Sequence, residues 1–257
     1  MPEIVLQNIE KIYPGPNGVK ALADIELTIQ NGEFVSVIGP SGCGKSTLLE
    51  IIAGLQPASQ GQVLIDGVPV LAPSRRIGVV FQDSSLFPWR TVLENVELGL
   101  ELQGKSKAAR RDLARKYIDL VNLHGFEHRY PHQLSGGMRQ RIGLARTLIN
   151  DPKVLLMDEP FGAVDHLTRI QLQDELLSIW EKDKKTVVFI THDVSEAIYL
   201  STRVVLLSAR PGRIRNIHGI PLHTRQDRNN MELIKIAEEI YGELNYDKPT
   251  DEPDYYL

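Results

Sequence analysis

The fold is decided at residues 39–46, which read Gly39-Pro40-Ser41-Gly42-Cys43-Gly44-Lys45-Ser46. This stretch fits the pattern G-x-x-x-x-G-K-[ST] of a phosphate-binding loop. The run before it, 33–38 (EFVSVI), has the β-branched composition of a buried parallel strand, and the run after it, 46–55 (STLLEIIAGL), reads as a helix. Because the pattern binds nucleotide when it joins a strand to a helix, the sequence predicts a nucleoside triphosphate site.

Each residue type in this loop has a physical role toward phosphate. Glycines let the backbone wrap so that its N–H groups point at the phosphates, and the positive end of the helix dipole faces the same anion. We predict that Lys45 reaches the β- and γ-phosphates, that the Ser46 hydroxyl binds Mg²⁺ and that Thr47 contacts the α-phosphate. The alternative is a chance glycine-rich turn, which the ordered strand, loop, lysine and helix argue against.

A second strand-like run, 153–157 (KVLLM), ends in Asp158 and Glu159. Carboxylates at the carboxyl end of a central strand lie beside the phosphate loop in doubly wound sheets. We therefore predict that Asp158 holds Mg²⁺, directly or through water, and that Glu159 polarises the attacking water. The alternative is a solvated acidic turn.

A second glycine pair, in residues 134–141 (LSGGMRQR), precedes this acidic strand. Together these stretches resemble the ATP-binding subunits of ABC transporters, since LSGGMRQR is similar to the family's signature loop and 154–160 (VLLMDEP) to its Walker B strand. The resemblance covers roughly residues 3 to 220, and its landmarks occur in the family's order. It implies that the cofactors are ATP and Mg²⁺.

Two more polar residues match landmarks of the family. Gln82 follows the run 77–81 (IGVVF) and is similar to the Q-loop glutamine, which reaches Mg²⁺ and senses the transmembrane partner. His192 follows the run 186–190 (TVVFI) and is similar to the switch histidine, whose imidazole could hydrogen-bond the γ-phosphate and orient the water. The alternatives are an ordinary polar residue at a strand end and a satisfied core histidine.

Tyr13 and Asp165 complete the set. Tyr13 is similar to the aromatic residue that stacks on adenine, and the turn cluster 14–18 (PGPNG) after it would expose the ring. Such stacking is worth about 1–3 kcal/mol by analogy with stacked bases elsewhere; a packing tyrosine is the alternative. Asp165 closes the segment 162–165 (GAVD), which is similar to the D-loop.

The chain departs from the family pattern in two places. The fifth position of the signature, usually glutamine, is Met138, and the D-loop's usual serine and leucine are Gly162 and Val164. The groups most needed remain, namely the Ser135 hydroxyl, the glycine amides and Asp165. The assignment is therefore kept.

The predicted fold class is α/β: a P-loop NTPase (RecA-like) parallel-sheet core with an antiparallel β subdomain and an α-helical subdomain. Alternating runs in residues 3–38 predict the antiparallel part, and helical spacing predicts an insertion at about 84–150 within a cassette of residues 1–226. Residues 227–257 are predicted to form an amphipathic helix and a loose acidic tail. The apolar face of the insertion's helix at 108–123 is expected to be Leu113, Tyr117, Leu120 and Val121, and that of the C-terminal helix Met231, Leu233, Ile234, Ala237, Ile240 and Tyr241.

The bulk composition fits an ordinary globular protein. Of 257 residues, 42% are hydrophobic and 24% charged, and the net charge of −4 gives no push toward nucleic acid. The one cysteine, Cys43, excludes an internal disulfide and fits a reducing compartment; because it lies in the phosphate loop, we expect alkylation to slow hydrolysis and ATP to protect it. We find no apolar run near the ~20 residues of a membrane span and no signal peptide, so a cytosolic protein is expected.

The resemblance implies several partners. In the family two subunits face head to tail, so that ATP at Lys45 of one is covered by Ser135, Gly136 and Gly137 of the other. We expect a homodimer, with a sister subunit of different sequence as the alternative. The resemblance also implies an integral-membrane permease and, indirectly, a substrate-binding protein, with the chain peripheral at the cytoplasmic side of the inner membrane.

Two further segments narrow the branch of the family. Residues 85–96 (SLFPWRTVLENV) and 209–214 (ARPGRI) resemble the bacterial importers for nitrate, taurine and aliphatic sulfonates. Some relatives in that branch handle pyrimidine precursors, which is the alternative substrate class. Residues 86–96 would form part of the groove for the permease, or an ordinary hydrophobic patch.

Two other classes of protein remain as alternatives. A non-transport ATPase of the same superfamily would act on DNA or ribosomes, but the chain has no room for a long coiled coil, holds one cassette and is acidic. An unrelated phosphate-loop kinase or GTPase would not need the signature loop, and the guanine-reading motif N-K-x-D is absent from the sequence. Exporter cassettes are often fused to membrane spans, so import is favoured over export.

Overall fold

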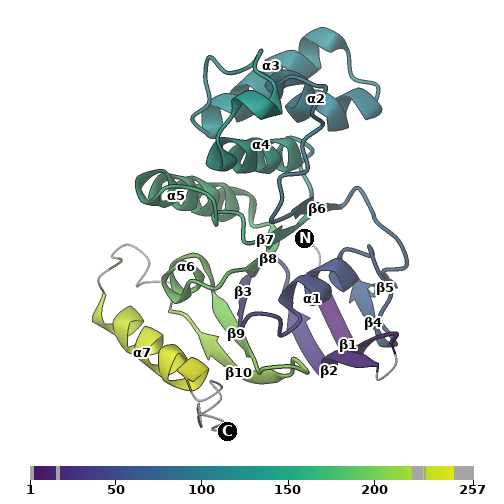
Figure 1. The fold of residues 1–257 in the computed structure, drawn as a ribbon, viewed down its shortest axis with the longest axis vertical. Coiled ribbons are helices and arrows are strands. Elements are labelled where there is room, and N and C mark those ends of the chain that lie inside the picture. Colours follow the sequence, from purple (N-terminus) through teal and green to yellow (C-terminus); the bar gives the residue numbers. More distant parts are fainter. Residues whose placement is uncertain (1–2, 16–17, 222–227, 229, 246–257) are drawn as a thin grey trace, which may run out of the picture.

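The computed structural model describes residues 3–15, 18–221, 228 and 230–245. Figure 1 shows three parts: the helices between residues 92 and 148 at one end, a central sheet with helices against it, and the N-terminal strands at the other end. The helical part is a single insertion, because residues 92–148 lie in the chain between two neighbouring strands of the central sheet.

The central sheet has six strands in the order β10-β9-β3-β8-β7-β6. Neighbours β9-β3-β8-β7-β6 run parallel, and β10 pairs antiparallel with β9. The bounds are β3 (Phe34–Ile38), β6 (Ile77–Val80), β7 (Val154–Asp158), β8 (Thr186–Ile190), β9 (Arg203–Leu207) and β10 (Ile214–Gly219). The predicted parallel core is confirmed.

Packing on both faces of the central sheet explains why β3, β7 and β8 are buried at every residue. Along β7, Leu155 and Met157 pack with the inserted helices and with α5 (His166–Asp183). Val154 and Leu156 point to the opposite face, where they pack with α1 (Lys45–Ile52) and the N-terminal strands. A strand buried on both faces needs a continuous apolar run, which these segments have.

The N-terminal sheet is antiparallel, as predicted, and has the order β2-β1-β4-β5. Its strands are β1 (Ile4–Tyr13), β2 (Val19–Ile29), β4 (Gln60–Ile65) and β5 (Val68–Pro69). The sheet brings Tyr13, at the end of β1, close to α1, since the Tyr13 hydroxyl lies 3.1 Å from Thr47 Oγ1.

The inserted layer consists of α2 (Val92–Leu102), α3 (Lys107–Leu120), a 3-10 turn (Pro131–Gln133) and α4 (Gly136–Leu148). The predicted apolar face of α3 was only partly right. Ala114, Ile118 and Val121 are buried, whereas the predicted Leu113, Tyr117 and Leu120 are partly buried beside them. The fully buried positions are therefore offset by one residue from most of the predicted ones, because Ala114 and Ile118 rather than Leu113 and Tyr117 face the core.

The helices α6 (Val194–Leu200) and α7 (Met231–Asn245) follow β8 and β10. The structure has a helix within the predicted C-terminal segment, but its predicted apolar face was partly wrong. Leu233 and Ile240 are buried and Ile236, Ala237 and Leu244 pack beside them, while Met231, Ile234 and Tyr241 are exposed. The predicted acidic tail lies outside the described residues.

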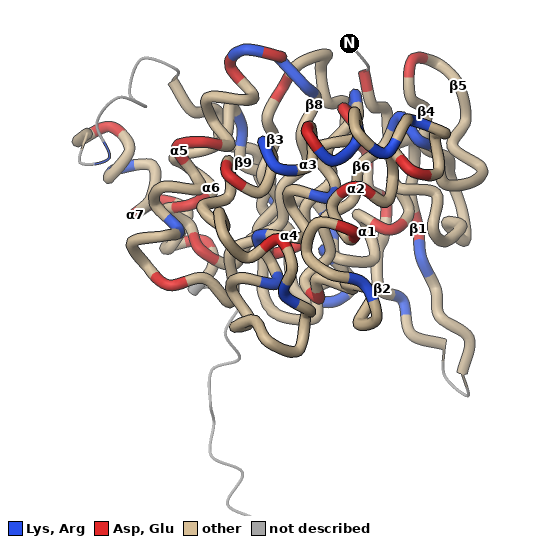
Figure 2. Tube along the Cα trace, turned by 90° about the horizontal axis from the view of Figure 1, so that it is seen from above, with Lys and Arg blue, Asp and Glu red and all other residues tan. Residues whose placement is uncertain are grey.

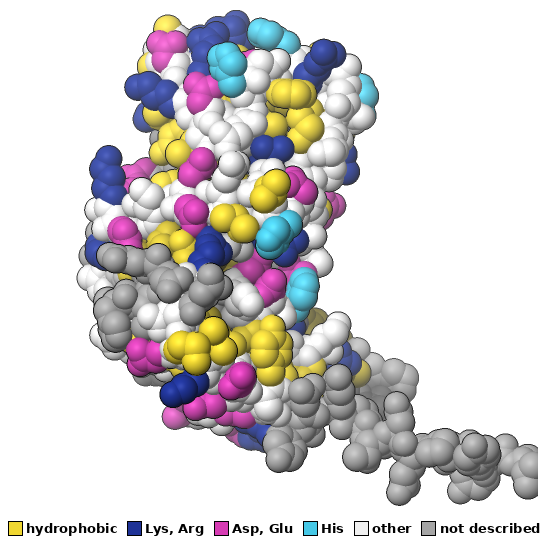
Figure 3. Space-filling view, turned by 90° about the vertical axis from the view of Figure 1, so that its left-hand side faces the viewer, with side chains coloured by type: hydrophobic (Ala, Val, Ile, Leu, Met, Phe, Trp, Pro, Cys, Tyr) yellow, Lys and Arg dark blue, Asp and Glu magenta, His cyan; other side chains and the backbone are white. Residues whose placement is uncertain are grey.

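The surface mixes charges and small apolar patches. In Figure 2, Lys and Arg alternate with Asp and Glu over most elements of the described chain. Figure 3 shows the side on which α5 and α7 lie, where hydrophobic side chains form separate patches among charged ones. Within the described residues, no helix has the length and apolar character required to cross a bilayer.

Candidate functional site

The phosphate loop joins the end of β3 to the start of α1. Gly44 caps that helix with a φ of 105°, and a Cβ there would lie 2.8 Å from Leu22 Cδ2, so only glycine fits. The Lys45 side chain is buried, and its Nζ donates to the carbonyl oxygens of Gly39 (2.8 Å) and Pro40 (3.0 Å). The lysine is therefore held in the curve of the loop, where a phosphate would meet it.

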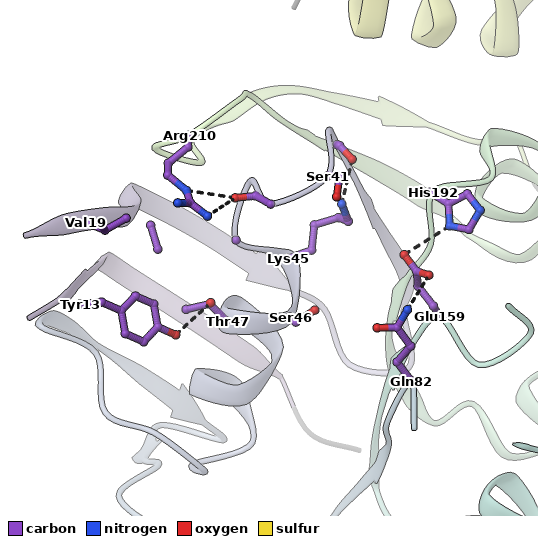
Figure 4. A pocket seen from close by; sticks show the side chains of 14 residues that line it. Tyr13, Val19, Ser41, Lys45, Ser46, Thr47, Gln82, Glu159, His192 and Arg210 are labelled. Carbon is purple, nitrogen blue, oxygen red and sulfur yellow. Dashed lines mark hydrogen bonds and ion pairs between the residues drawn. The ribbon is translucent and has the colours of Figure 1, made fainter. Parts of the chain in front are cut away.

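A cavity of about 620 Å³ opens beside this loop (Figure 4). Its size suits a nucleotide-sized ligand. Most residues predicted to bind nucleotide line it, although they come from five separate segments: Tyr13, Gly39, Ser41, Gly42, Gly44, Lys45, Ser46, Thr47, Gln82, Glu159 and His192. Pro40, Cys43 and Asp158 are next to lining residues in the chain but do not themselves line the cavity.

Tyr13 lies at one end of the cavity, and Glu159 and His192 lie at the other (Figure 4). Tyr13 is 37% exposed, and its hydroxyl is hydrogen-bonded to Thr47 and to Gln56. An anchored, half-exposed ring offers a flat face on which a base can stack. Of the turn cluster predicted to expose it, residues 16 and 17 lie outside the described residues.

Asp158 and Ser46 form the part of the site that fits a cation. Burial raises the pKa of the Asp158 carboxyl, the hydrogen bond with the Ser46 hydroxyl acts in the opposite direction, and the nearby Glu159 charge raises the pKa further. A cation beside this buried carboxylate, in addition to the Lys45 ammonium already near it, would therefore be favoured. Carboxylate and hydroxyl oxygens are the ligands that Mg²⁺ takes, so the residues present fit the predicted cation.

Glu159 has an unusual backbone for a residue that is not glycine, with a φ of 45°. The left-handed region costs such a residue about 1–2 kcal/mol, and residues held there cluster at functional sites. Its carboxylate lies between two other predicted site residues: Gln82 Nε2 donates to Oε2 at 3.3 Å, and His192 Nδ1 lies 3.3 Å from Oε1. The turn after β7 thus aims the carboxylate into the cavity.

The signature residues lie elsewhere. Ser135 caps α4, its hydroxyl accepting a hydrogen bond from Met138 N at 3.2 Å, and Gly136 and Gly137 form the first turn of that helix. Asp165 caps α5 in the same way by accepting from Thr168 N, which lowers the pKa of the Asp165 carboxyl. Among the described residues, none of these four lines the cavity. The chain therefore does not bring its signature loop to its own phosphate loop.

The expectation of an accessible Cys43 thiol is wrong. The side chain is 1% exposed, and a Cβ at Gly39 would lie 3.0 Å from Cys43 Sγ, so the sulfur points into the protein behind the loop. Burial raises the pKa of the Cys43 thiol, although the Lys45 charge acts against it. The burial of the sulfur and the raised pKa of the thiol both make Cys43 less reactive.

Sequence reasoning missed two residues near the site. Arg210 lines the cavity, and its Nε and Nη2 donate to the Gly42 carbonyl at 3.2 and 3.1 Å. Gln140, two positions beyond Met138, donates to the Glu159 carbonyl at 2.9 Å. Both lie in segments that the sequence had singled out, 209–214 and 134–141, but nothing in the sequence gives these contacts.

Comparison with known proteins decides the family. The family model described as "ABC transporter" matches residues 22–162, which is more than half of the chain. The chain belongs to the ABC transporter family. An uncharacterized ABC transporter ATP-binding protein of Methanocaldococcus jannaschii is 54% identical over 243 residues, 94% of this chain and 91% of the relative. An aliphatic sulfonates import ATP-binding protein of Bacillus cereus is 44% identical over 244 residues, 95% of this chain and 96% of the relative.

Solved structures agree with the fold of this ABC ATPase. A dimeric, post-hydrolysis structure of the ATP-binding cassette MJ0796 bound to ADP and Pi is similar, with a TM-score of 0.80 and 37% identity over 85% of this chain and 99% of the solved one. The predicted cassette fold is confirmed. The chain is an ATP-binding subunit whose ATP hydrolysis is coupled to transport.

Proposed function

We propose that this ABC ATPase powers the import of an aliphatic sulfonate or a related small molecule such as taurine or nitrate. The observation that carries the substrate class is the similarity to aliphatic sulfonates import ATP-binding proteins, at 44% identity for the Bacillus cereus relative and 50% for one of Bacillus anthracis over 83% of this chain. Residues 85–96 and 209–214 support the same branch. A pyrimidine precursor is the alternative substrate.

In the proposed reaction, this chain's residues hold the triphosphate and activate water. Lys45 and the loop amides bind the phosphates, and Ser46, Gln82 and Asp158 would hold Mg²⁺, which neutralises charge on the phosphates when bound. Glu159 accepts a proton from the attacking water, and His192, 3.3 Å from its carboxylate, orients both. Tyr13 stacks on the base at the other end of the cavity.

We propose that the working unit is a dimer in which Ser135, Gly136 and Gly137 cover the partner's nucleotide. The absence of these residues from the cavity of their own chain supports this arrangement. Each glycine amide at the start of α4 offers an N–H to a phosphate, and the helix dipole favours the same anion. Hydrolysis would remove the bridging γ-phosphate and relax the dimer.

The loop before α2 is the proposed contact with the permease, which would place the chain at the cytoplasmic side of the inner membrane. Trp89 is 70% exposed and its ring lies 5.3 Å from that of Phe87, also exposed. Exposed aromatic side chains on an anchored loop are suited to a protein partner. A substrate-binding protein would deliver the substrate to that permease.

The test is a Glu159→Gln variant, purified with a tag from membranes of its own host in MgATP. We expect unchanged ATP binding, loss of hydrolysis by at least about 100-fold and a trapped dimer that brings the permease with it. The control is Glu239→Gln, an exposed glutamate on α7. The copurified system's binding protein is then screened with alkanesulfonates, taurine, nitrate and pyrimidine precursors.

Three outcomes contradict the proposal in different ways. A variant that stays monomeric in saturating MgATP excludes the closure mechanism. Recovery of ribosomes or nucleic acid without a permease excludes import. Binding of a pyrimidine precursor, with no affinity for sulfonates, taurine or nitrate, selects the alternative substrate.

A further inference from the structure

We propose that Gln140 is a positioning residue that links the signature helix α4 to the catalytic carboxylate in the same chain. This inference rests on the role of Glu159 in the proposed function. It assigns Gln140 no contact with nucleotide, since the residue is absent from the cavity lining. Its action would pass through the backbone on which Glu159 is mounted.

Gln140 makes three hydrogen bonds to two loops, one that holds Gln82 and one that holds both Glu159 and Ala163. Its Nε2 donates to the carbonyl of Glu159 at 2.9 Å and to that of Gln82 at 3.3 Å, and its Oε1 accepts from Ala163 N at 2.9 Å. The side chain is 4% exposed, so water cannot readily replace these bonds. One amide thus joins α4 to the segments that carry the predicted base, the Q-loop glutamine and the D-loop.

The backbone of Glu159 needs such support. Its φ of 45° is disfavoured, and it persists because the peptide groups on both sides are fixed. The Glu159 N–H donates to Ile190 O at 2.9 Å on β8, while its carbonyl accepts from Gly162 N at 3.1 Å and from Gln140. Of these partners, only Gln140 lies on a helix outside the central sheet and its loops.

The rest of the same face of α4 holds the chain on both sides of Gln82. Arg146 donates to the carbonyls of Ser84 and Ser85 at 2.8 and 2.9 Å, and Thr147 Oγ1 donates to Val79 O at 3.1 Å. The helix that begins at the signature loop therefore touches both the glutamate and the glutamine bonded to its carboxylate.

This arrangement gives α4 a second task. Its first turn is proposed to grip the nucleotide held by the partner, while Gln140, one turn later, holds the base that acts on the nucleotide of its own chain. A small displacement of α4 when the dimer closes would therefore shift the backbone of Glu159. The geometry points to a link between the two sites of a dimer that runs through one side chain.

The test compares Gln140→Leu, which keeps the volume and removes the hydrogen bonds, with Gln173→Leu. Gln173 is a matched control because it is 3% exposed and bonded to Glu196 on α6, away from the cavity lining. We expect MgATP affinity within about threefold of wild type for both. For Gln140→Leu alone we expect kcat to fall about 10- to 100-fold, since a misplaced base loses part of its ~10²–10⁴-fold contribution.

A double-mutant cycle separates positioning from a general structural role. In a Glu159→Gln background the base is already gone, so adding Gln140→Leu should change the residual single-turnover rate by less than about twofold. Gln140→Glu keeps the acceptor for Ala163 N but loses the donor to Glu159. Gln140→Glu should show the same loss of kcat, and it replaces Gln140→Leu in the test if the leucine variant does not fold.

Failures of the two proposals are distinguishable. If Glu159→Gln hydrolyses ATP normally, the proposed role of Glu159 is wrong. If Glu159→Gln is inactive but both Gln140 variants keep the wild-type kcat, only the inference about Gln140 is overturned. Losses that multiply in the double variant would likewise overturn it, because they show that Gln140 does not act through Glu159.

Discussion

The phosphate loop packs against the loop between β9 and β10, and the substitution Gly212→Ala tests that contact. Gly212 lies between β9 and β10, and its N–H donates to Ala21 O at 2.9 Å while its carbonyl accepts from Ala23 N at 3.0 Å. A Cβ built at this position would lie 2.2 Å from the carbonyl oxygen of Cys43. The substitution therefore pushes directly on the backbone of the phosphate loop.

The size of the effect follows from that distance. The contact is roughly 0.8 Å short of the 3.0 Å below which real Cβ contacts essentially do not occur, and the atom in the way is backbone. Since Gly212 does not have a left-handed φ, the cost is steric. Overpacking of this kind costs about 1–3 kcal/mol. For a chain of this length that corresponds to a fall in Tm of about 2–12 °C.

Function should suffer more than stability, because the displaced carbonyl belongs to the residue between Gly42 and Gly44. We expect kcat/KM for ATP to fall by about 10- to 100-fold, since a displacement near 1 Å can cost 10²-fold. Tm by calorimetry and steady-state hydrolysis check both numbers. Gly219→Ala is the control, because a Cβ there has no heavy atom of the described chain within 4 Å. A Gly212→Ala protein with the Tm and activity of that control would refute the reasoning.

Two other expectations follow from buried groups. Because burial raises the pKa of the Cys43 thiol, its thiolate fraction at neutral pH is below that of a free thiol. Labelling of Cys43 by iodoacetamide should therefore be slow in the folded protein, increase as the pH rises past the ordinary pKa of 9.0 and be fast in urea. Rapid labelling of the folded protein at pH 7 would contradict this expectation. The Asn95 side chain, with 0% exposure, is hydrogen-bonded to the backbone of Phe87, Arg90 and Thr91. Asn95→Leu should therefore lower the free energy of unfolding by about 1–3 kcal/mol and make the loop of residues 87–91 susceptible to limited proteolysis. A loop that stays as resistant as in the wild type would show that the Asn95 amide does not hold it.

Strands of the central sheet could be predicted from sequence because their signal is local. The runs ending at Ile38, Asp158 and Ile190 are apolar at nearly every position, as two-sided burial requires, and each is followed by a polar or glycine-rich turn. The faces of α3 and α7 were harder. On α7, Ile236 and Leu244 pack against the core cluster formed by α6, β9 and their neighbours, while the equally apolar Ile234 and Tyr241 are exposed, and the choice depends on where those elements lie.

The candidate site also contains residues that could be predicted from sequence and features that could not. Lys45, Ser46 and Asp158 could be predicted because each belongs to a short stretch whose backbone conformation and chemistry are set together. The direction of the Cys43 side chain could not, since it depends on the turns taken by the glycines on either side and on the loop of Gly212 packed behind them.

Contacts between distant segments lie beyond any local pattern. Gln140 is 19 positions before Glu159 and 23 before Ala163 in the chain, yet one amide bonds both. A glutamine on a helix is ordinary in sequence, and its importance appears only when the helix is packed and the left-handed Glu159 is seen beside it. The residues predicted to touch phosphate are therefore recognisable from sequence, whereas those that hold them in place are recognisable only from the fold. In this chain the second group includes Gln140 and Gly212, and its members are where substitutions should alter hydrolysis without altering any predicted motif.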